Sequence, residues 1–246
     1  MPALFQQWTS RVIAAAGIQP GQRVLDVVCG TGALTRAAAV QIGPTGKAIG
    51  LDVSAGMLAV AARLAPEIAW WQGAAESLPF DTASFDAVVS QFGLMFFANQ
   101  AAGLQEMMRV LAPGGYLAVA VWDTLDRTPG YAALVALLQR LFGEHAADAL
   151  RAPFALGEAR TLSALLTGAG IPAPEIATQV GTARFPSIRS WIYTDVKGWS
   201  PLGTQLDAGQ FEVLTAEAER PLRAFVTANG TVEFPMPAHI VTARKA

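Results

Sequence analysis

The chain has 246 residues, of which 52% are hydrophobic and 15% charged; this composition excludes a disordered chain and suits one large domain. Its formal net charge of -2, with acidic and basic residues interspersed, argues against nucleic acid as a partner. With a single cysteine, no recognisable signal peptide and no apolar run near the roughly 20 residues of a membrane span, we expect a cytoplasmic protein and leave its oligomeric state open.

The first half alternates short apolar runs with helical patterns. Strands are predicted at Arg23–Cys29, Lys47–Leu51, Ile68–Gln72, Phe85–Phe92 and Tyr116–Trp122, and helices at Gly32–Gln41, Ser54–Leu64 and Gln100–Leu111. Ser54 is the expected N-cap of the second helix, and the Pro113-Gly114-Gly115 stretch ends the third. Such alternation with short links predicts an α/β fold whose mainly parallel sheet is covered on both faces.

The second half is less regular. Its spacing predicts helices at Tyr131–Phe142, Ala159–Ala169, Ile188–Lys197 and Gln210–Ala228, and strands at Ile176–Phe185 and Thr231–Ala243. Pro235 and Pro237 in the last of these are typical of a strand edge or a bulge. The scattered aromatic residues Phe185, Trp191 and Trp199 fit the packing of a small lobe better than the lining of a pocket.

The main chemical signal is the turn after the first strand, where residues 24–35 read VLDVVCGTGALT. Gly30 and Gly32 lack a Cβ where the backbone must approach a ligand, and the helix that follows offers free N–H groups. Asp26 suits a cationic ammonium group, and Asp52, at the end of the second strand, suits the two hydroxyls of a ribose. The pattern therefore favours a nucleoside site over a generic turn, and Cys29 is interpreted as a small buried residue.

Residues 24–35 resemble motif I of class I S-adenosylmethionine (SAM)-dependent methyltransferases. Three later stretches, Gln72–Phe80, Ser84–Phe97 and Glu106–Leu117, follow in an order similar to that of the UbiE-like group, the methyltransferase 11 type. The resemblance covers about residues 5–122, with a weaker echo at Ala159–Ile171. It implies a Rossmann-like class I methyltransferase fold: a seven-stranded, mostly parallel sheet with a reversed last strand, a helical cap and SAM as the cofactor.

The same resemblance implies roles for individual residues. Asp26 would bind the methionine ammonium group, Asp52 the ribose, Met57 the adenine face, and Gln91 would face the methyl-donor region. The full set implied to contact the cofactor is Asp26, Gly30, Gly32, Asp52, Val53, Met57, Ala75, Glu76 and Gln91.

Two departures from the family pattern keep alternatives open. Val28 stands where the family usually has Gly or Ala, and Ala74 stands where an acidic residue usually accepts from the adenine amino group. A non-methylating protein of the same fold therefore stays an alternative. An NAD-dependent oxidoreductase is disfavoured, because Thr35 replaces the third Gly or Ala of its glycine motif.

The chain is expected to form one methyltransferase domain in which residues 128–156 and 186–230 are cap segments. Because these segments are apolar, they predict a small apolar or aromatic acceptor. Methyl transfer depends mainly on alignment, so no catalytic residue is identified. His145 and His239 have no motif context, and no metal site is expected.

Overall fold

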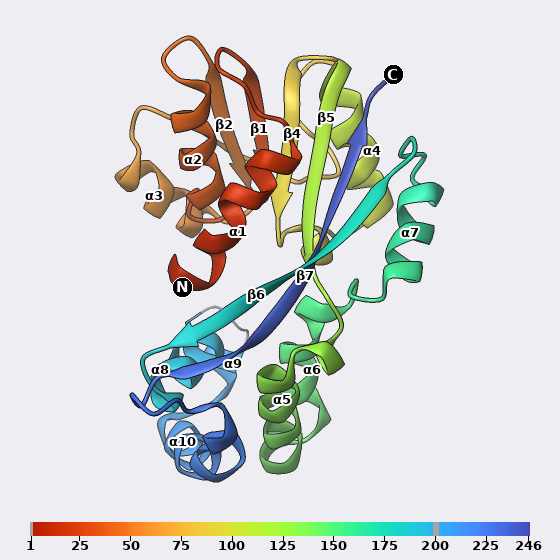
Figure 1. The fold of residues 1–246 in the computed structure, drawn as a ribbon. Coiled ribbons are helices and arrows are strands. Elements are labelled where there is room, and N and C mark those ends of the chain that lie inside the picture. Colours follow the sequence, from red (N-terminus) through yellow and green to blue (C-terminus); the bar gives the residue numbers. More distant parts are fainter. Residues whose placement is uncertain (1, 199–201) are drawn as a thin grey trace.

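The computed structural model describes residues 2–198 and 202–246, so Trp199 lies outside the described residues. Its centre is a seven-stranded sheet in the order β3-β2-β1-β4-β5-β7-β6 (Figure 1). The strands are β1 (Arg23–Val27), β2 (Lys47–Asp52), β3 (Ala69–Gln72), β4 (Phe85–Gln91), β5 (Leu111–Trp122), β6 (Glu175–Phe185) and β7 (Val232–Arg244). Strand β7 runs antiparallel to β5 and β6, and the pairs among β1 to β5 are parallel. The predicted fold class is thereby confirmed.

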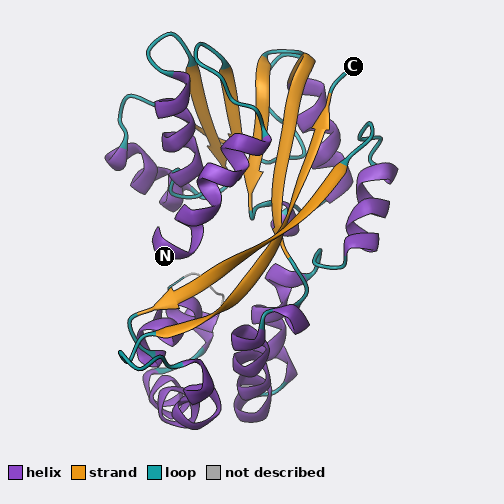
Figure 2. Ribbon diagram, in the orientation of Figure 1, coloured by secondary structure: helices purple, strands orange, loops and turns teal. Residues whose placement is uncertain are grey.

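Helices flank the sheet on both faces (Figure 2). They are α1 (Pro2–Ala15), α2 (Ala33–Ile42), α3 (Ala55–Leu64), α4 (Gln100–Val110) and α7 (Ala159–Gly168). As predicted, Ser54 caps α3, with its hydroxyl accepting the N–H of Met57 at 3.3 Å. Helix α1 was not predicted, although Leu4, Trp8 and Val12 recur at helical spacing and are buried.

The Pro113-Gly114-Gly115 stretch differs from its expected role as a break between helix and strand. Strand β5 already begins at Leu111, and its register against β4 shifts so that Phe85 pairs with Leu111 and Ala87 with Tyr116. A Cβ at Gly115 would come within 2.7 Å of the Asp86 carbonyl oxygen. The stretch is therefore a bulge within the strand, which requires glycine for close backbone approach.

The prolines of β7 lie where the strand is paired on one side. Residues Ala238–Thr242 pair with both β5 and β6, whereas Val232–Pro237 pair with β6. Pro235 and Pro237 therefore cost no bond to β5, which explains why prolines are tolerated in a strand that is central elsewhere. Beyond the sheet, β6 and β7 continue as a two-stranded ribbon (Figure 1).

A group of helices lies at the far end of this ribbon (Figure 1): α5 (Pro129–Phe142), α6 (Glu144–Arg151), α8 (Ile188–Ile192), α9 (Leu202–Gln205) and α10 (Ala208–Leu222). Helix α5 packs against α10, and Arg140 pairs with Glu217 at 2.7 Å. Trp191 is fully buried and stacks on Phe185 at 5.5 Å, which fits the packing interpretation. Helix α10 ends six positions before the predicted Ala228, since Val226 forms a bridge with Val232 after a turn.

Candidate functional site

Asp52 joins two of the predicted site elements. It ends β2, and its Oδ2 accepts the N–H of Gly30 at 2.8 Å, while its Oδ1 accepts the N–H of Ser54 at 2.8 Å. The carboxylate thus ties the turn after β1 to the start of α3. Each carboxylate oxygen has a further lone pair, so Asp52 can still accept from a ribose hydroxyl.

Asp26 lies at the end of β1 with one carboxylate oxygen unpaired. Its Oδ2 accepts from the Thr35 hydroxyl at 2.6 Å, whereas its Oδ1 is buried and has no hydrogen-bond partner. Burial raises the pKa of Asp26 to about 7, against the opposing effect of the Thr35 hydrogen bond, and the nearby Asp52 raises it further. A buried carboxylate oxygen without a hydrogen-bond partner is stabilised by a nearby positive charge, so this site fits an ammonium group.

The two glycines of the turn have different reasons to be glycine. Gly30 has φ +55°, and a Cβ there would meet nothing within 4 Å, so open space lies above it. Gly32 has φ +76°, and its Cβ would come within 2.2 Å of the Trp70 ring. The open space is compatible with the ligand-facing role predicted for Gly30, which stays a prediction, while Gly32 is required by a side chain of β3 that sequence reasoning had not considered.

Val28 and Phe92 carry backbone strain at the ends of β1 and β4. Their φ angles are 58° and 57°, in the left-handed region that a β-branched or bulky residue rarely adopts. Val28 sits beside Gly93, where an added Cβ would lie 2.9 Å from the Val28 Cβ. Strain of this kind, on the order of 1–3 kcal/mol per residue, clusters at functional sites.

The residues implied to hold adenine lie in two places: the apolar segment at the start of α3 and the loop after β3. Val53 and Met57 are 58% and 38% exposed, so their side chains are available to a flat ring. Ala75 is buried and packs in the hydrophobic core, so its side chain is not exposed to a ligand. The side chain of Glu76 is engaged elsewhere, because its Oε1 accepts the N–H of Asn99 at 3.0 Å.

Gln91 lies next to an aromatic cluster that includes residues of α1. Its Nε2 donates to the carbonyl oxygen of Phe5 at 3.2 Å, and its Oε1 is buried without a hydrogen-bond partner. Trp8 lies edge-on to both Phe92 and Trp122, which stack on each other at 3.5 Å. Sequence reasoning missed Phe5 and Trp8, whose signal was two aromatic residues one helical turn apart.

The buried polar groups considered as a base form structural hydrogen bonds. His239 is buried, with Nε2 2.8 Å from the Gly157 carbonyl oxygen and Nδ1 2.8 Å from the Thr178 hydroxyl. Tyr131 and Trp191 both donate to Asp195 in the interior of the distal helices. His145 is exposed on α6. Burial raises the pKa of the Cys29 thiol, which keeps it protonated and a poor nucleophile.

The described residues hold neither a cluster of metal ligands nor a membrane-spanning helix. Across residues 2–198 and 202–246, no three His, Cys, Asp or Glu side chains are grouped as ligands for a metal ion. Within the same part of the chain, every helix is too short or too polar to cross a membrane.

Comparison with known proteins places these features in a family. Residues 24–115 match the model of a methyltransferase domain. The chain is 40% identical over 123 residues to a demethylmenaquinone methyltransferase of Beutenbergia cavernae, covering 50% of each chain. It is 39% identical over 122 residues to the ubiquinone/menaquinone biosynthesis C-methyltransferase UbiE of Ectopseudomonas mendocina, covering 47% of this chain and 48% of that protein. The chain thus spans about half the length of the curated relatives it matches.

Among solved structures, the YcgJ protein of Bacillus subtilis is similar over 98% of both chains, with a TM-score of 0.66 and 20% identity. At that identity the likeness establishes the fold. Residues 24–115 thus match a methyltransferase domain, within a chain that has the fold of that structure.

Proposed function

We propose that this chain, whose residues 24–115 match a methyltransferase domain, is a SAM-dependent methyltransferase acting on a small aromatic acceptor. The observation that carries the proposal is the unpaired, buried Oδ1 of Asp26. Asp26 precedes the turn on which Gly30 faces open space. A ligand that places a cation at Asp26 and a sugar at Asp52 satisfies both carboxylates. NAD supplies no ammonium group for Asp26.

The chain's own residues divide the work of holding such a ligand. Asp26 accepts from the ammonium group, Asp52 accepts from the ribose hydroxyls, and Met57 and Val53 cover the adenine face. Gly30 leaves room for the methionine part to lie on the turn. When bound there, SAM supplies an activated methyl group on a sulfonium, which is transferred by in-line displacement. The protein contributes chiefly alignment and exclusion of water.

The acceptor side is formed by α1 and the ends of β4 and β5. Phe5, Trp8, Phe92 and Trp122 form an aromatic cluster there, and the buried Trp8 Nε1, Ser90 Oγ and Gln91 Oε1 have no hydrogen-bond partner. Flat rings that bear oxygen atoms complement both features. The relatives that act on demethylmenaquinone have such an acceptor, and we extend that acceptor class, a reduced naphthoquinone, to this chain.

The distal helices, residues 128–156 and 186–230, are proposed to act as the cap of this site. These helices lie at the end of the β6–β7 ribbon, toward the end of the sheet where β4 ends (Figure 1). The short helix at Leu94–Phe96, directly after β4, touches the helical turn at Ala152–Phe154, which links the site to the cap. The cap would exclude water from the acceptor.

Transfer of a labelled methyl group tests this function. Purified protein, labelled SAM and a reduced short-chain naphthoquinone should yield a methylated ring, and Gly30→Leu should yield none because its side chain fills the open space. Other acceptors, a catechol and a primary amine, test the predicted class. Tight binding of SAM without transfer to any acceptor would favour the alternative of a non-methylating protein, for which Val28 and Ala74 are the supporting departures.

A further inference from the structure

Recognition of adenine lacks the usual acidic side chain in this chain. The loop after β3 carries Ala74, which has no hydrogen-bonding side chain, and Glu76, which is bound to the N–H of Asn99 at the start of α4. Ala75 turns its side chain into the interior. Backbone groups of residues 73–76 are therefore left to read the adenine edge, and their placement, fixed where the loop continues to Leu78, decides how well they do so.

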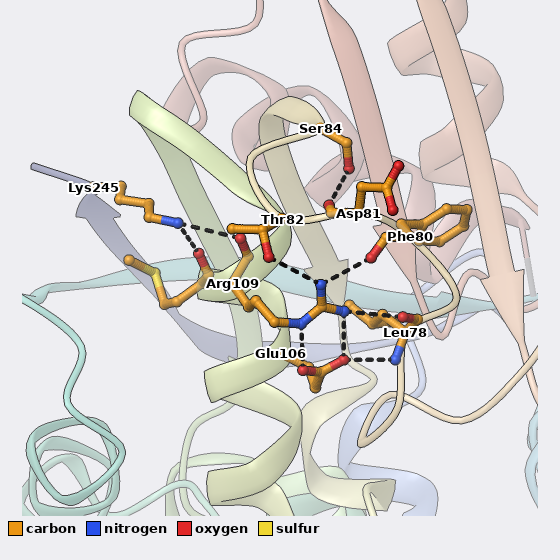
Figure 3. Close-up of polar contacts among 9 residues, drawn as sticks. Leu78, Phe80, Asp81, Thr82, Ser84, Glu106, Arg109 and Lys245 are labelled. Atoms are coloured by element: carbon orange, nitrogen blue, oxygen red, sulfur yellow. Dashed lines mark hydrogen bonds and ion pairs between the residues drawn. The ribbon is translucent and has the colours of Figure 1, made fainter.

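A pair of charged side chains on α4 fixes that loop (Figure 3). Glu106 Oε2 accepts the N–H of Leu78 at 2.8 Å, and Arg109 Nη2 donates to the C=O of Leu78 at 3.0 Å. Both backbone groups of one loop residue are thus held from the same helix. Arg109 Nη1 also donates to the C=O of Phe80 at 2.8 Å, which extends the contact along the loop.

The pair is itself rigid. Arg109 donates twice to Glu106, from Nε to Oε1 at 2.6 Å and from Nη2 to Oε2 at 2.8 Å. Parallel bonds between a guanidinium and a carboxylate fix the orientation of both planes as well as their distance. Glu106 holds the pKa of Arg109 above its usual value, and Arg109 holds that of Glu106 below, so both stay charged at neutral pH.

We propose that Glu106 and Arg109 are positioning residues for adenine recognition, holding residues 73–78 so that the loop backbone reads the adenine edge. The proposal rests on the proposed function, since it assumes that the nucleoside is that of SAM. It assigns a role to the Glu106–Leu117 stretch, which the sequence resemblance singled out and the reaction itself does not use. An arginine-to-lysine exchange is not conservative here, because lysine cannot make the fork of bonds.

Lys245 provides a matched control. At the end of α4, its Nζ donates to the carbonyl oxygen of Arg109 at 3.2 Å (Figure 3). It also donates to those of Met108 at 2.6 Å and Leu111 at 2.7 Å. A Lys245→Met variant therefore loosens the same end of the same helix, while the bonds from Glu106 and Arg109 to Leu78 remain. A general loss of stability at this helix end is thereby separated from a loss of loop position.

The test is nucleoside selectivity, measured as the ratio of Kd values for S-inosylhomocysteine and S-adenosylhomocysteine (SAH), which differ at the 6-position of the base. Wild type should favour SAH. Arg109→Lys and, as the milder variant, Glu106→Gln should lower the ratio about fivefold or more, whereas Lys245→Met should leave it unchanged at a similar loss of Tm. An unchanged ratio in both loop variants, with SAH still bound, would overturn the positioning role alone. Failure of wild type to bind either compound would overturn the proposed function with it.

Discussion

Asp26 combines full burial with an unpaired oxygen, and its protonation should control cofactor binding. Its pKa is raised to about 7, chiefly by burial, and the groups that face it are the Thr35 hydroxyl, the Cys29 thiol and the Asp52 carboxylate. Below that pH the folded protein holds Asp26 neutral, and a neutral acid cannot pair with an ammonium group. Affinity for SAH should therefore fall about tenfold between pH 7.5 and pH 6, as the site loses its charge.

The pH dependence of folding stability has the opposite sign to that of SAH affinity. Because the folded-state pKa of Asp26 lies above its usual value of 3.8, the folded protein binds a proton that the unfolded chain releases. Stability from this group is full at low pH and declines as pH rises from about 4 to about 7. Asp26→Asn should hence be more stable than wild type at pH 8 by on the order of 1–3 kcal/mol, yet bind SAH weakly at every pH. A pH-independent SAH affinity in wild type would contradict this role of Asp26.

Asp52 is expected to contribute in two ways. Asp52→Ala removes the predicted partner of the ribose hydroxyls and also the acceptor of the Gly30 and Ser54 N–H groups. SAH binding should weaken by about 1–3 kcal/mol, the usual range for a lost charged hydrogen bond or an unpaired donor. Calorimetry gives this value directly, with Asp81→Ala, an exposed acidic residue away from the turn, as the control. Equal affinity in wild type and Asp52→Ala would remove Asp52 from the site.

At the scale of elements, the ends of β1 and β4 should be energetically coupled. A Cβ at Gly93 would lie 2.9 Å from the Val28 Cβ and 2.6 Å from the Ser90 hydroxyl, so Gly93→Ala should destabilise the fold by about 1–3 kcal/mol. Val28→Gly removes both that contact and the left-handed strain of valine. In the double variant part of the loss should return, giving a coupling energy above about 0.5 kcal/mol in denaturant titrations. Strict additivity would show that the two turns are independent.

Replacing the two histidines should change the stability of the protein by different amounts and should leave its turnover largely unchanged in both cases. His239→Ala leaves the Gly157 carbonyl and the Thr178 hydroxyl unpaired between β6 and β7 and should cost about 1–3 kcal/mol. Exposed His145→Ala should stay within about 0.5 kcal/mol of wild type. Both variants, once folded, should retain most of their turnover, because the reaction depends on alignment. A hundredfold loss of turnover with normal SAH binding would make that histidine a general base.

Elements could be predicted where local pattern decides them. Strands β1 to β4 follow from short apolar runs bounded by glycine or polar turns, and Ser54 and Gly43 mark helix ends as capping rules require. Helix α1 was missed although Leu4, Trp8 and Val12 recur at helical spacing. The bulge in β5 and the early end of α10 depend on partners elsewhere, the Asp86 carbonyl and Val232, which no local pattern reveals.

For the whole molecule, motif order predicted the topology because a parallel sheet of this kind admits few arrangements of strand, turn and helix. The same order placed Asp26, Asp52 and Gln91 at one edge of the sheet. It could not predict the Phe5 and Trp8 contacts with Trp122, or the Gly157–His239 bond, because these join segments separated by long stretches of chain. The requirement for glycine at Gly32 could not be predicted either, because it depends on the position of the Trp70 ring.

Direct titration calorimetry of the intact chain with SAH, SAM and NAD at pH 7.5 tests the central claim most directly. The structure predicts one site per chain that binds SAH and SAM, no measurable heat with NAD, and no SAH binding by Gly30→Leu with its folded thermal transition retained. Binding of NAD in preference to SAH, or SAH affinity that survives in Gly30→Leu, would contradict the account.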